Sequence, residues 1–443
     1  MLDIARLIKE KKYAQIKKIL GELNEYDIAE ILEGLKPKES IKLFRLLNKD
    51  IAADVFSYMD TDVQAELISL LNDTEAVEII NEMSADDATD LIDEMPANVV
   101  SRLLSKVDSE TRRDINQLLK YPDNSAGSIM TVEYLDFKEE NTIREALKKI
   151  KREYDEKETI DTCFVTDKSR KLIGTITLKD LVINDEDKKI SEIMDGEIFT
   201  VNTHTDQEEV ANTMQNYDLT SIAVVDSENK LVGIITIDDI LDIVEQETTE
   251  DIEKMAGITP TEKSYLKLSV FELFKSRIPW LLVLMISAAF TGKIIEHYEA
   301  ALATCVILTS FIPMLMNTGG NAGGQASATI IRSLSLEDVE YKDTLKIVFK
   351  ELRVAILAGI TLAIANFAKL MLIDQVGFEI SLVVSLSLII TVCAAKAIGS
   401  TLPILAKRLG LDPTVMASPF ITTLVDAISL FIFFNFATLI LGI

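Results

Sequence analysis

The sequence predicts a multidomain protein: an all-α superhelical N-terminal domain, an α/β tandem pair, a long acidic connecting helix and a five-helix α transmembrane domain. Three observations support this fold class: short helical repeats early in the chain, an internal duplication in the middle, and late apolar stretches long enough to span a bilayer. The predicted boundaries are 1–123 for the N-terminal domain, 124–190 and 191–246 for the two modules, 247–277 for the connecting helix and 278–443 for the transmembrane domain.

The N-terminal domain is predicted from pieces of about a dozen residues, such as AELISLLNDTEA and VEIINEMSADDA. Each piece has apolar positions at helical spacing followed by a polar turn, so it buries its apolar face only against its neighbours. Residues 51–100 contain 13 acids and no Lys or Arg, which is more one-sided than solubility requires. Such a surface attracts cations, although acidity alone is also typical of a soluble surface.

The net charge of −26 excludes some function classes. Nearly all of it lies in residues 1–277, and a surface this acidic repels phosphate backbones, so we expect no nucleic-acid partner. The three cysteines form no CxxC motif and the two histidines stand apart, which argues against zinc, iron–sulfur and disulfide frameworks. The N-terminus lacks the apolar core of a signal peptide, so we expect the first 277 residues in the cytosol.

The duplication spans residues 124–253, and each copy reads as strand, helix, two strands and helix. The segments LIGTITLKDL and LVGIITIDDI align with Gly174 and Gly233 in matching positions. This arrangement resembles a tandem pair of CBS modules. The resemblance implies a regulatory sensor of adenine nucleotides or ions, and it leaves open whether a nucleotide binds here.

The connecting segment DDILDIVEQETTEDIEKMAG is predicted as a helix with eight acids and no base before Lys254. Like charges four residues apart, at Asp238–Asp242 and Glu247–Asp251, destabilise an isolated helix. A solvated linker would not need this charge, whereas a helix neutralised by bound cations would use it.

Five apolar stretches are predicted to span the membrane, at about 278–296, 300–317, 354–373, 380–403 and 414–441. Basic residues cluster before the first stretch, between the second and third, and between the fourth and fifth. The positive-inside rule therefore predicts a multi-pass plasma-membrane protein with a cytoplasmic N-terminus and an external C-terminus.

Polar side chains interrupt the fifth stretch. Ser418, Thr422, Asp426 and Ser429 share one helical face, with Asp426 about 18 Å into the span and near the bilayer centre. A stripe of oxygens at this depth suits a hard cation. Two alternatives remain: Asp426 forms a hydrogen bond that joins two helices, or it pairs with Lys396 of the fourth stretch.

A second polar cluster is PMLMNTGGNAGGQASATIIR, residues 313–332. Its four glycines, with Asn317, Asn321 and Gln325, predict that the second span ends in broken backbone beside water, which would form a mouth for a hydrated ion. The alternative is a glycine-rich surface for close helix packing.

The motifs GGNAGGQ and PFITTLVDAISL, in this domain order, resemble the MgtE family of magnesium channels and transporters. The resemblance implies a homodimer in the lipid bilayer, with a pore between the second and fifth helices and Mg²⁺ bound at Asp426. Ser418 departs from members with Asn before the proline, which puts contacts at the pore entry in question. The pore-lining residues implied are Asn317, Asn321, Gln325, Ser418 and Thr422. The cytosolic Mg²⁺ ligands implied are Asp86, Asp90, Asp206, Glu208, Asp218, Asp239, Asp242, Glu247, Glu250 and Asp251.

The expected function is Mg²⁺-selective, channel-like uptake down the electrochemical gradient, closed when cytosolic Mg²⁺ binds the acidic region. Alternatives are a CBS-regulated transporter of another substrate, such as Co²⁺ or an anion, and a non-transporting membrane Mg²⁺ sensor. The sequence shows no nucleophile–base set and no GxxxxGK[ST] motif, so neither an enzyme nor an ATP-driven pump is expected.

Overall fold

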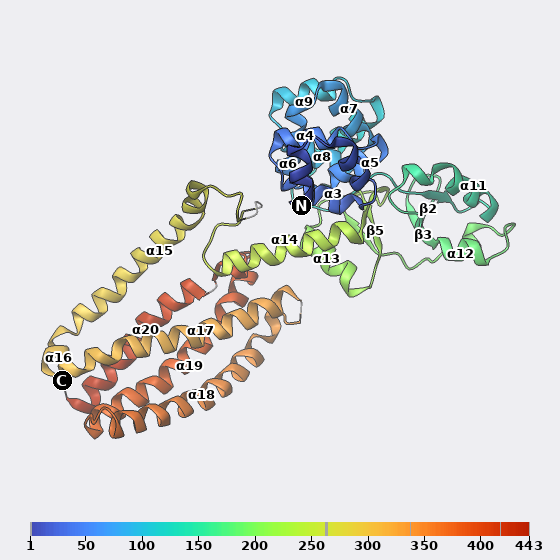
Figure 1. The fold of residues 1–443 in the computed structure, drawn as a ribbon. Coiled ribbons are helices and arrows are strands. Elements are labelled where there is room, and N and C mark those ends of the chain that lie inside the picture. Colours follow the sequence, from blue (N-terminus) through green and yellow to red (C-terminus); the bar gives the residue numbers. More distant parts are fainter. Residues whose placement is uncertain (1, 262–264, 337, 417, 443) are drawn as a thin grey trace. The chain divides into compact units, whose positions relative to one another are not determined.

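The computed structural model describes residues 2–261, 265–336, 338–416 and 418–442 (Figure 1). The chain divides into two compact units, residues 1–244 and 245–443. The first unit contains a helical domain and a duplicated α/β module, and the second contains the long apolar helices.

The helical domain consists of short helices that alternate with tight turns, as predicted. Polar side chains begin several of them, for example at Asn72, whose side chain accepts from the backbone of Glu75 while Glu75 caps in return. The helices are α1 (Leu2–Lys9), α2 (Tyr13–Leu20), α3 (Glu25–Glu33), α4 (Pro37–Phe44), α5 (Lys49–Ser57), α6 (Thr61–Leu70), α7 (Asp73–Glu82), α8 (Ala85–Asp93), α9 (Ala97–Leu104) and α10 (Ser109–Leu118).

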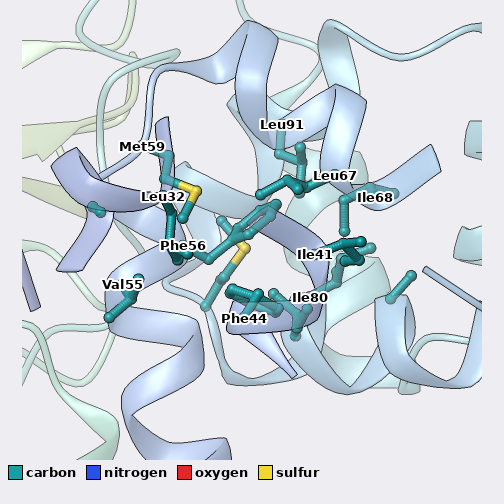
Figure 2. Packing of buried hydrophobic residues seen from close by; sticks show 14 of the residues in the cluster. Leu32, Ile41, Phe44, Val55, Phe56, Met59, Leu67, Ile68, Ile80 and Leu91 are labelled. Carbon is teal, nitrogen blue, oxygen red and sulfur yellow. The ribbon is translucent and has the colours of Figure 1, made fainter. Parts of the chain in front are cut away.

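None of these helices is long enough to be stable alone in water, so packing must hold them. Figure 2 shows their shared core, in which the rings of Phe44 and Phe56 meet edge to face at a centroid distance of 5.9 Å. Leu32, Leu67 and Ile80 are almost fully buried around them. The apolar positions of the repeats therefore form one continuous core.

The duplication forms two similar three-stranded sheets, each with one parallel and one antiparallel pairing. The first module contains β1 (Asp136–Lys138), α11 (Ile143–Glu153), η1 (Tyr154–Glu156), β2 (Thr162–Thr166), β3 (Leu172–Thr177), α12 (Leu178–Ile183) and η2 (Ile190–Glu192). The second contains β4 (Thr200–Asn202), α13 (Gln207–Asn216), β5 (Ser221–Val225) and β6 (Leu231–Thr236).

The two aligned glycines have the same structural role. A Cβ on Gly174 would lie 2.9 Å from the carbonyl oxygen of Asp195, and one on Gly233 would lie 2.8 Å from that of Thr131. Thr131 forms a β-bridge with Ile234, next to Gly233, and Asp195 forms one with Thr175, next to Gly174. Each glycine therefore leaves room for a segment of the other module to cross its strand.

The acidic helix begins earlier and ends earlier than predicted. α14 (Ile237–Met255) starts directly after β6, and Gly257, with φ of +70°, follows its end as a C-terminal cap. The next helix begins only at Val270, so the prediction of one connecting helix over 247–277 is wrong.

The second unit contains α15 (Val270–His297), α16 (Glu299–Thr304), η3 (Val306–Phe311), α17 (Ile312–Ser335), η4 (Tyr341–Asp343), α18 (Thr344–Leu372), α19 (Phe378–Arg408), η5 (Pro413–Met416) and α20 (Ser418–Leu441). Four segments within the described residues are long and apolar enough to cross a membrane, those containing α15, α18, α19 and α20. The predicted span at 300–317 is wrong, because α16 and η3 interrupt it and α17 begins only at Ile312.

α17 carries the glycine motif as continuous helix, so the predicted break in the backbone is wrong. Its glycines instead form a packing face, as the alternative stated. A Cβ on Gly319 would lie 2.8 Å from side chains of both α19 and α20, and one on Gly320 would lie 2.8 Å from Thr422. Figure 1 shows α17 running beside α19 and α20, which this absence of side chains permits.

We predict that Gly399→Ala destabilises the second unit by about 1–3 kcal/mol, because its Cβ would overlap the carbonyl group of Gly323 on α17. The measurement is the thermal unfolding temperature of the purified protein in detergent. Gly292→Ala on α15 is the matched control, since a Cβ there meets no atom within 4 Å and alanine favours helix. Equal unfolding temperatures for the two variants would contradict the packing role.

Candidate cation path and cytosolic acidic cluster

Asp426 lies in α20, about 12 Å from the start of this helix at Ser418, and within the candidate span Pro413–Leu441. Its carboxylate is half-buried, and its Oδ1 is buried with no hydrogen-bond partner among the described residues. Ser429, one turn further on, is fully buried and donates to the Val425 carbonyl at 2.6 Å. The side chain of Ser418 lies outside the described residues. Asp426 is thus an acid whose charge the described chain leaves uncompensated at Oδ1.

The predicted alternative of an Asp426–Lys396 pair is wrong. Lys396 Nζ, on α19, instead donates to Glu351 Oε2 of α18 at 3.1 Å. The other alternative, in which Asp426 joins two helices by a hydrogen bond, also lacks support at Oδ1, which has no hydrogen-bond partner among the described residues.

The predicted amide side chains form an exposed stripe on α17. Asn317, Asn321 and Gln325 follow one another at four-residue spacing, and Asn321 Nδ2 donates to Asn317 Oδ1 at 3.3 Å. Thr422 of α20 contacts the same helix at Gly320. The structure therefore places the amide stripe and Asp426 on two helices in direct contact, where both could face one hydrated ion.

In the first unit, predicted acids from two distant segments meet. Asp86 and Asp90 lie on α8, and Asp239 lies in the first turn of α14, where it accepts from Thr236 Oγ1 at 2.9 Å. Asp86 is only 9% exposed, and its Oδ1 is buried without a hydrogen-bond partner.

Burial and mutual repulsion raise the pKa values of these carboxyls. Burial, followed by the charge of Asp239, raises the pKa of Asp86 well above its ordinary value. Burial raises the pKa of Asp90 to about 7 and that of Asp239 to about 6. These carboxylates are held where a cation would stabilise their charged forms.

Sequence reasoning missed Asp87, Glu133 and Glu158. Burial raises the pKa of Glu158 to about 7, with further contributions from Asp239 and Asp238, and burial likewise raises the pKa of Glu133 to about 7. We call Asp86, Asp87, Asp90, Glu133, Glu158 and Asp239 the acidic cluster. Glu133 and Glu158 lie in two loops of the first module, and the Glu158 amide donates a hydrogen bond to the Glu133 carbonyl. No sequence motif identifies these two residues as members of the cluster.

Other predicted ligands lie elsewhere. Asp206 is exposed at the start of α13, where it accepts from the Glu208 amide at 2.9 Å, and Asp218 is exposed after the same helix. Asp242 is exposed on α14. No three acidic, histidine or cysteine side chains among the described residues converge closely enough to form a ready-made metal site. Any Mg²⁺ bound here would therefore keep much of its water.

The C-terminal half of α14 belongs to the second unit and contacts other segments of that unit. Lys254 Nζ pairs with Asp412 Oδ2 at 2.7 Å and also with Glu250, while Asp251 accepts from Ser335 Oγ at 3.2 Å. Burial lowers the pKa of Lys254, but its bonds to Asp412 and Glu250 outweigh this and raise it above its ordinary value. Glu247 is half-buried on the same helix. Glu250, predicted as a Mg²⁺ ligand, is thus already paired with a fixed cation.

Sequence models of three families match the chain. The MgtE family, described as a divalent cation transporter, matches residues 312–436. The MgtE intracellular N domain matches residues 23–124, and the CBS domain matches 126–186 and 190–246.

Named relatives match most of the chain. The magnesium transporter MgtE of Thermus thermophilus is 36% identical over 341 residues, or 77% of this chain and 75% of that protein. The magnesium transporter MgtE of Bacillus subtilis is 32% identical over 442 residues, or 99% of this chain and 96% of that protein.

A solved structure matches about half of the chain. It is the cytosolic domain of the Mg²⁺ channel MgtE in complex with ATP, with 35% identity and a TM-score of 0.52 over 54% of this chain and 98% of that one. Because relatives match across nearly the whole chain, including the helices that carry Asp426 and the amide stripe, the chain belongs to the MgtE family of divalent cation transporters.

Proposed function

We propose that the protein is a Mg²⁺-selective, channel-like transporter for uptake down the electrochemical gradient, closed by cytosolic Mg²⁺. The observation that carries this proposal is Asp426, an acid in a span, whose Oδ1 has no partner and whose helix contacts the amide stripe. A charged side chain at this depth costs several kcal/mol unless something neutralises it. A passing hydrated dication does so, and the named relatives are magnesium transporters.

The path is completed by a second copy in a homodimer. Asn317, Asn321 and Gln325 are exposed on α17, and amide groups are costly against lipid. A twofold arrangement would place two stripes and two Asp426 carboxylates around one axis. The wide ring of oxygens suits Mg²⁺, which releases its water reluctantly. α17 supplies a fifth spanning helix, its polar face turned to this axis.

The membrane potential drives entry. The protein lies in the plasma membrane with its N-terminus in the cytoplasm and its C-terminus outside. A divalent ion moving inward gains about 4.6 kcal/mol per 100 mV, so transport needs no ATP hydrolysis. The relative solved with ATP supports an adenine nucleotide at the CBS pair in a regulatory role.

Cytosolic Mg²⁺ closes the path by neutralising acids. Without the ion, the acidic cluster repels itself and the N-terminal domain separates from the CBS pair. Bound Mg²⁺ favours the compact state, which holds α14 against the second unit as a plug. The exposed acids Asp206, Asp218 and Asp242, with the half-buried Glu208 and Glu247, add weaker sites of the same kind.

We predict that Asp426→Asn lowers Mg²⁺ flux into liposomes at least about tenfold, because the charge that stabilises the ion in the span is lost. Asp374→Asn, which removes an acid paired with Lys369 outside the spans, should leave flux unchanged. Unchanged flux in Asp426→Asn would favour a non-transporting sensor. The same assay with Co²⁺ separates Mg²⁺ selectivity from transport of other divalent ions.

We predict that Mg²⁺ at millimolar concentration slows proteolysis between the N-terminal domain and the CBS pair, and more at pH 8 than at pH 6. The raised pKa values mean that the compact state binds protons more tightly than the separated state. Its stability without Mg²⁺ is therefore highest below the ordinary carboxyl pKa of about 4, declines as pH rises, and is lost as pH passes about 7. Limited proteolysis of the full chain measures this, and cleavage independent of both pH and Mg²⁺ would contradict the sensing role.

We predict that Lys254→Met raises the cytosolic Mg²⁺ concentration needed for half-closure by roughly threefold to tenfold, because α14 loses its bonds to Asp412. Flux measured over a series of internal Mg²⁺ concentrations gives this value. Lys293→Met, which breaks an exposed pair with Glu296, is the control. A half-closure concentration equal to that of wild type would exclude this contact from the gate.

A further inference from the structure

The Lys396–Glu351 pair joins two of the apolar helices, α19 and α18, and the proposed transport cycle does not use it. Its two side chains are only 9% and 16% exposed, and both residues lie within helices apolar enough to cross a membrane. Most other ion pairs in the second unit are more exposed, such as Lys293–Glu296 at 77% and 64%. Protein stability alone explains such a buried pair poorly, because well-packed apolar side chains in its place often stabilise a fold as much or more.

The position of Lys396 relates it to the cation path. Neighbouring residues of α19 pack against the glycine face of α17: the Ala395 carbonyl lies 3.2 Å from the Cβ position of Gly323, and Gly399 meets the same turn. Lys396 therefore belongs to the segment directly behind α17, whose amide stripe lines the proposed path. Helices packed through glycine have axes about 8 Å apart. The proposed path lies on another face of α17, so the Lys396 charge is further from the ion than this spacing, but in a low dielectric an unpaired positive charge still repels a dication.

We propose that Glu351 is a positioning residue for cation transport, which screens Lys396 so that its positive charge does not oppose a divalent cation in the path beside α17. Lys396 in turn fixes Glu351 through the 3.1 Å bond and joins α18 to α19. The pair presents no net charge to the ion, while either partner alone would present one. This inference rests on the proposed transport function.

The test is Mg²⁺ flux into liposomes for four full-length proteins: wild type, Glu351→Gln, Lys396→Met and the double variant. Glu351→Gln leaves an unpaired cation and should lower flux about tenfold or more. Lys396→Met leaves an unpaired acid and should keep flux at or above wild type. The double variant has no net charge and should return to within about threefold of wild type. Glu296→Gln, which removes the acid of an exposed pair, is the matched control.

A purely structural pair predicts a different pattern, in which both single variants lose flux and the double variant does not recover. That pattern, in variants whose unfolding temperatures show that they fold, would overturn the inference. Unchanged flux in Glu351→Gln would also overturn this inference. If wild-type flux still depended on Asp426, the proposed function would remain supported. If Glu351→Gln does not fold, the flux of Lys396→Met decides: flux at or above wild type supports the inference, and lower flux overturns it. Wild-type flux that does not depend on Asp426 would overturn the proposed function and this inference together.

Discussion

A carboxylate inside a bilayer must be compensated, and the organisation of the second unit follows from how Asp426 meets that requirement. The nearby lysine that could have neutralised it is bound to Glu351 instead. Its Oδ1 is buried without a partner, yet the residue lies one turn from oxygens of Thr422 and Ser429. The negative charge thus remains available to a mobile cation, which a fixed counter-charge would have displaced.

The glycines of α17 serve this arrangement indirectly. With no side chains at Gly319, Gly320 and Gly323, the helix approaches α19 and α20 closely on one face. The amide side chains can then occupy another face without being drawn into the contact. Close packing fixes the position of the stripe relative to Asp426, and the proposed path for a hydrated ion relies on that fixed spacing.

The acidic cluster of the first unit presents the same physical problem outside the membrane. Asp86 is buried with an unpartnered oxygen, and the carboxyls around it have pKa values raised to about 6 or 7. Neutralisation by protons stabilises this arrangement. In the proposed function, Mg²⁺ neutralises the same acids. By contrast, Glu250 and Asp412 are paired with Lys254, and Glu351 is paired with Lys396, so these acids do not require a metal ion.

The sequence by itself determined the helical repeats, the duplicated module, the apolar spans of α15, α18, α19 and α20, and the presence of Asp426 at depth. Periodicity, internal alignment and hydropathy are local properties, so they can be read without knowing what packs against what. Only the tertiary structure decided that the helix is interrupted within residues 300–317 and that the glycine motif is helical. A glycine-rich segment is stabilised as a helix when side chains of neighbouring helices fill the space beside its glycines. It also decided that Lys396 pairs with Glu351, and that Glu133 and Glu158 join acids of α8 and α14 that are distant in sequence. Burial and charge pairing depend on which segments meet, and no local pattern in the chain records that.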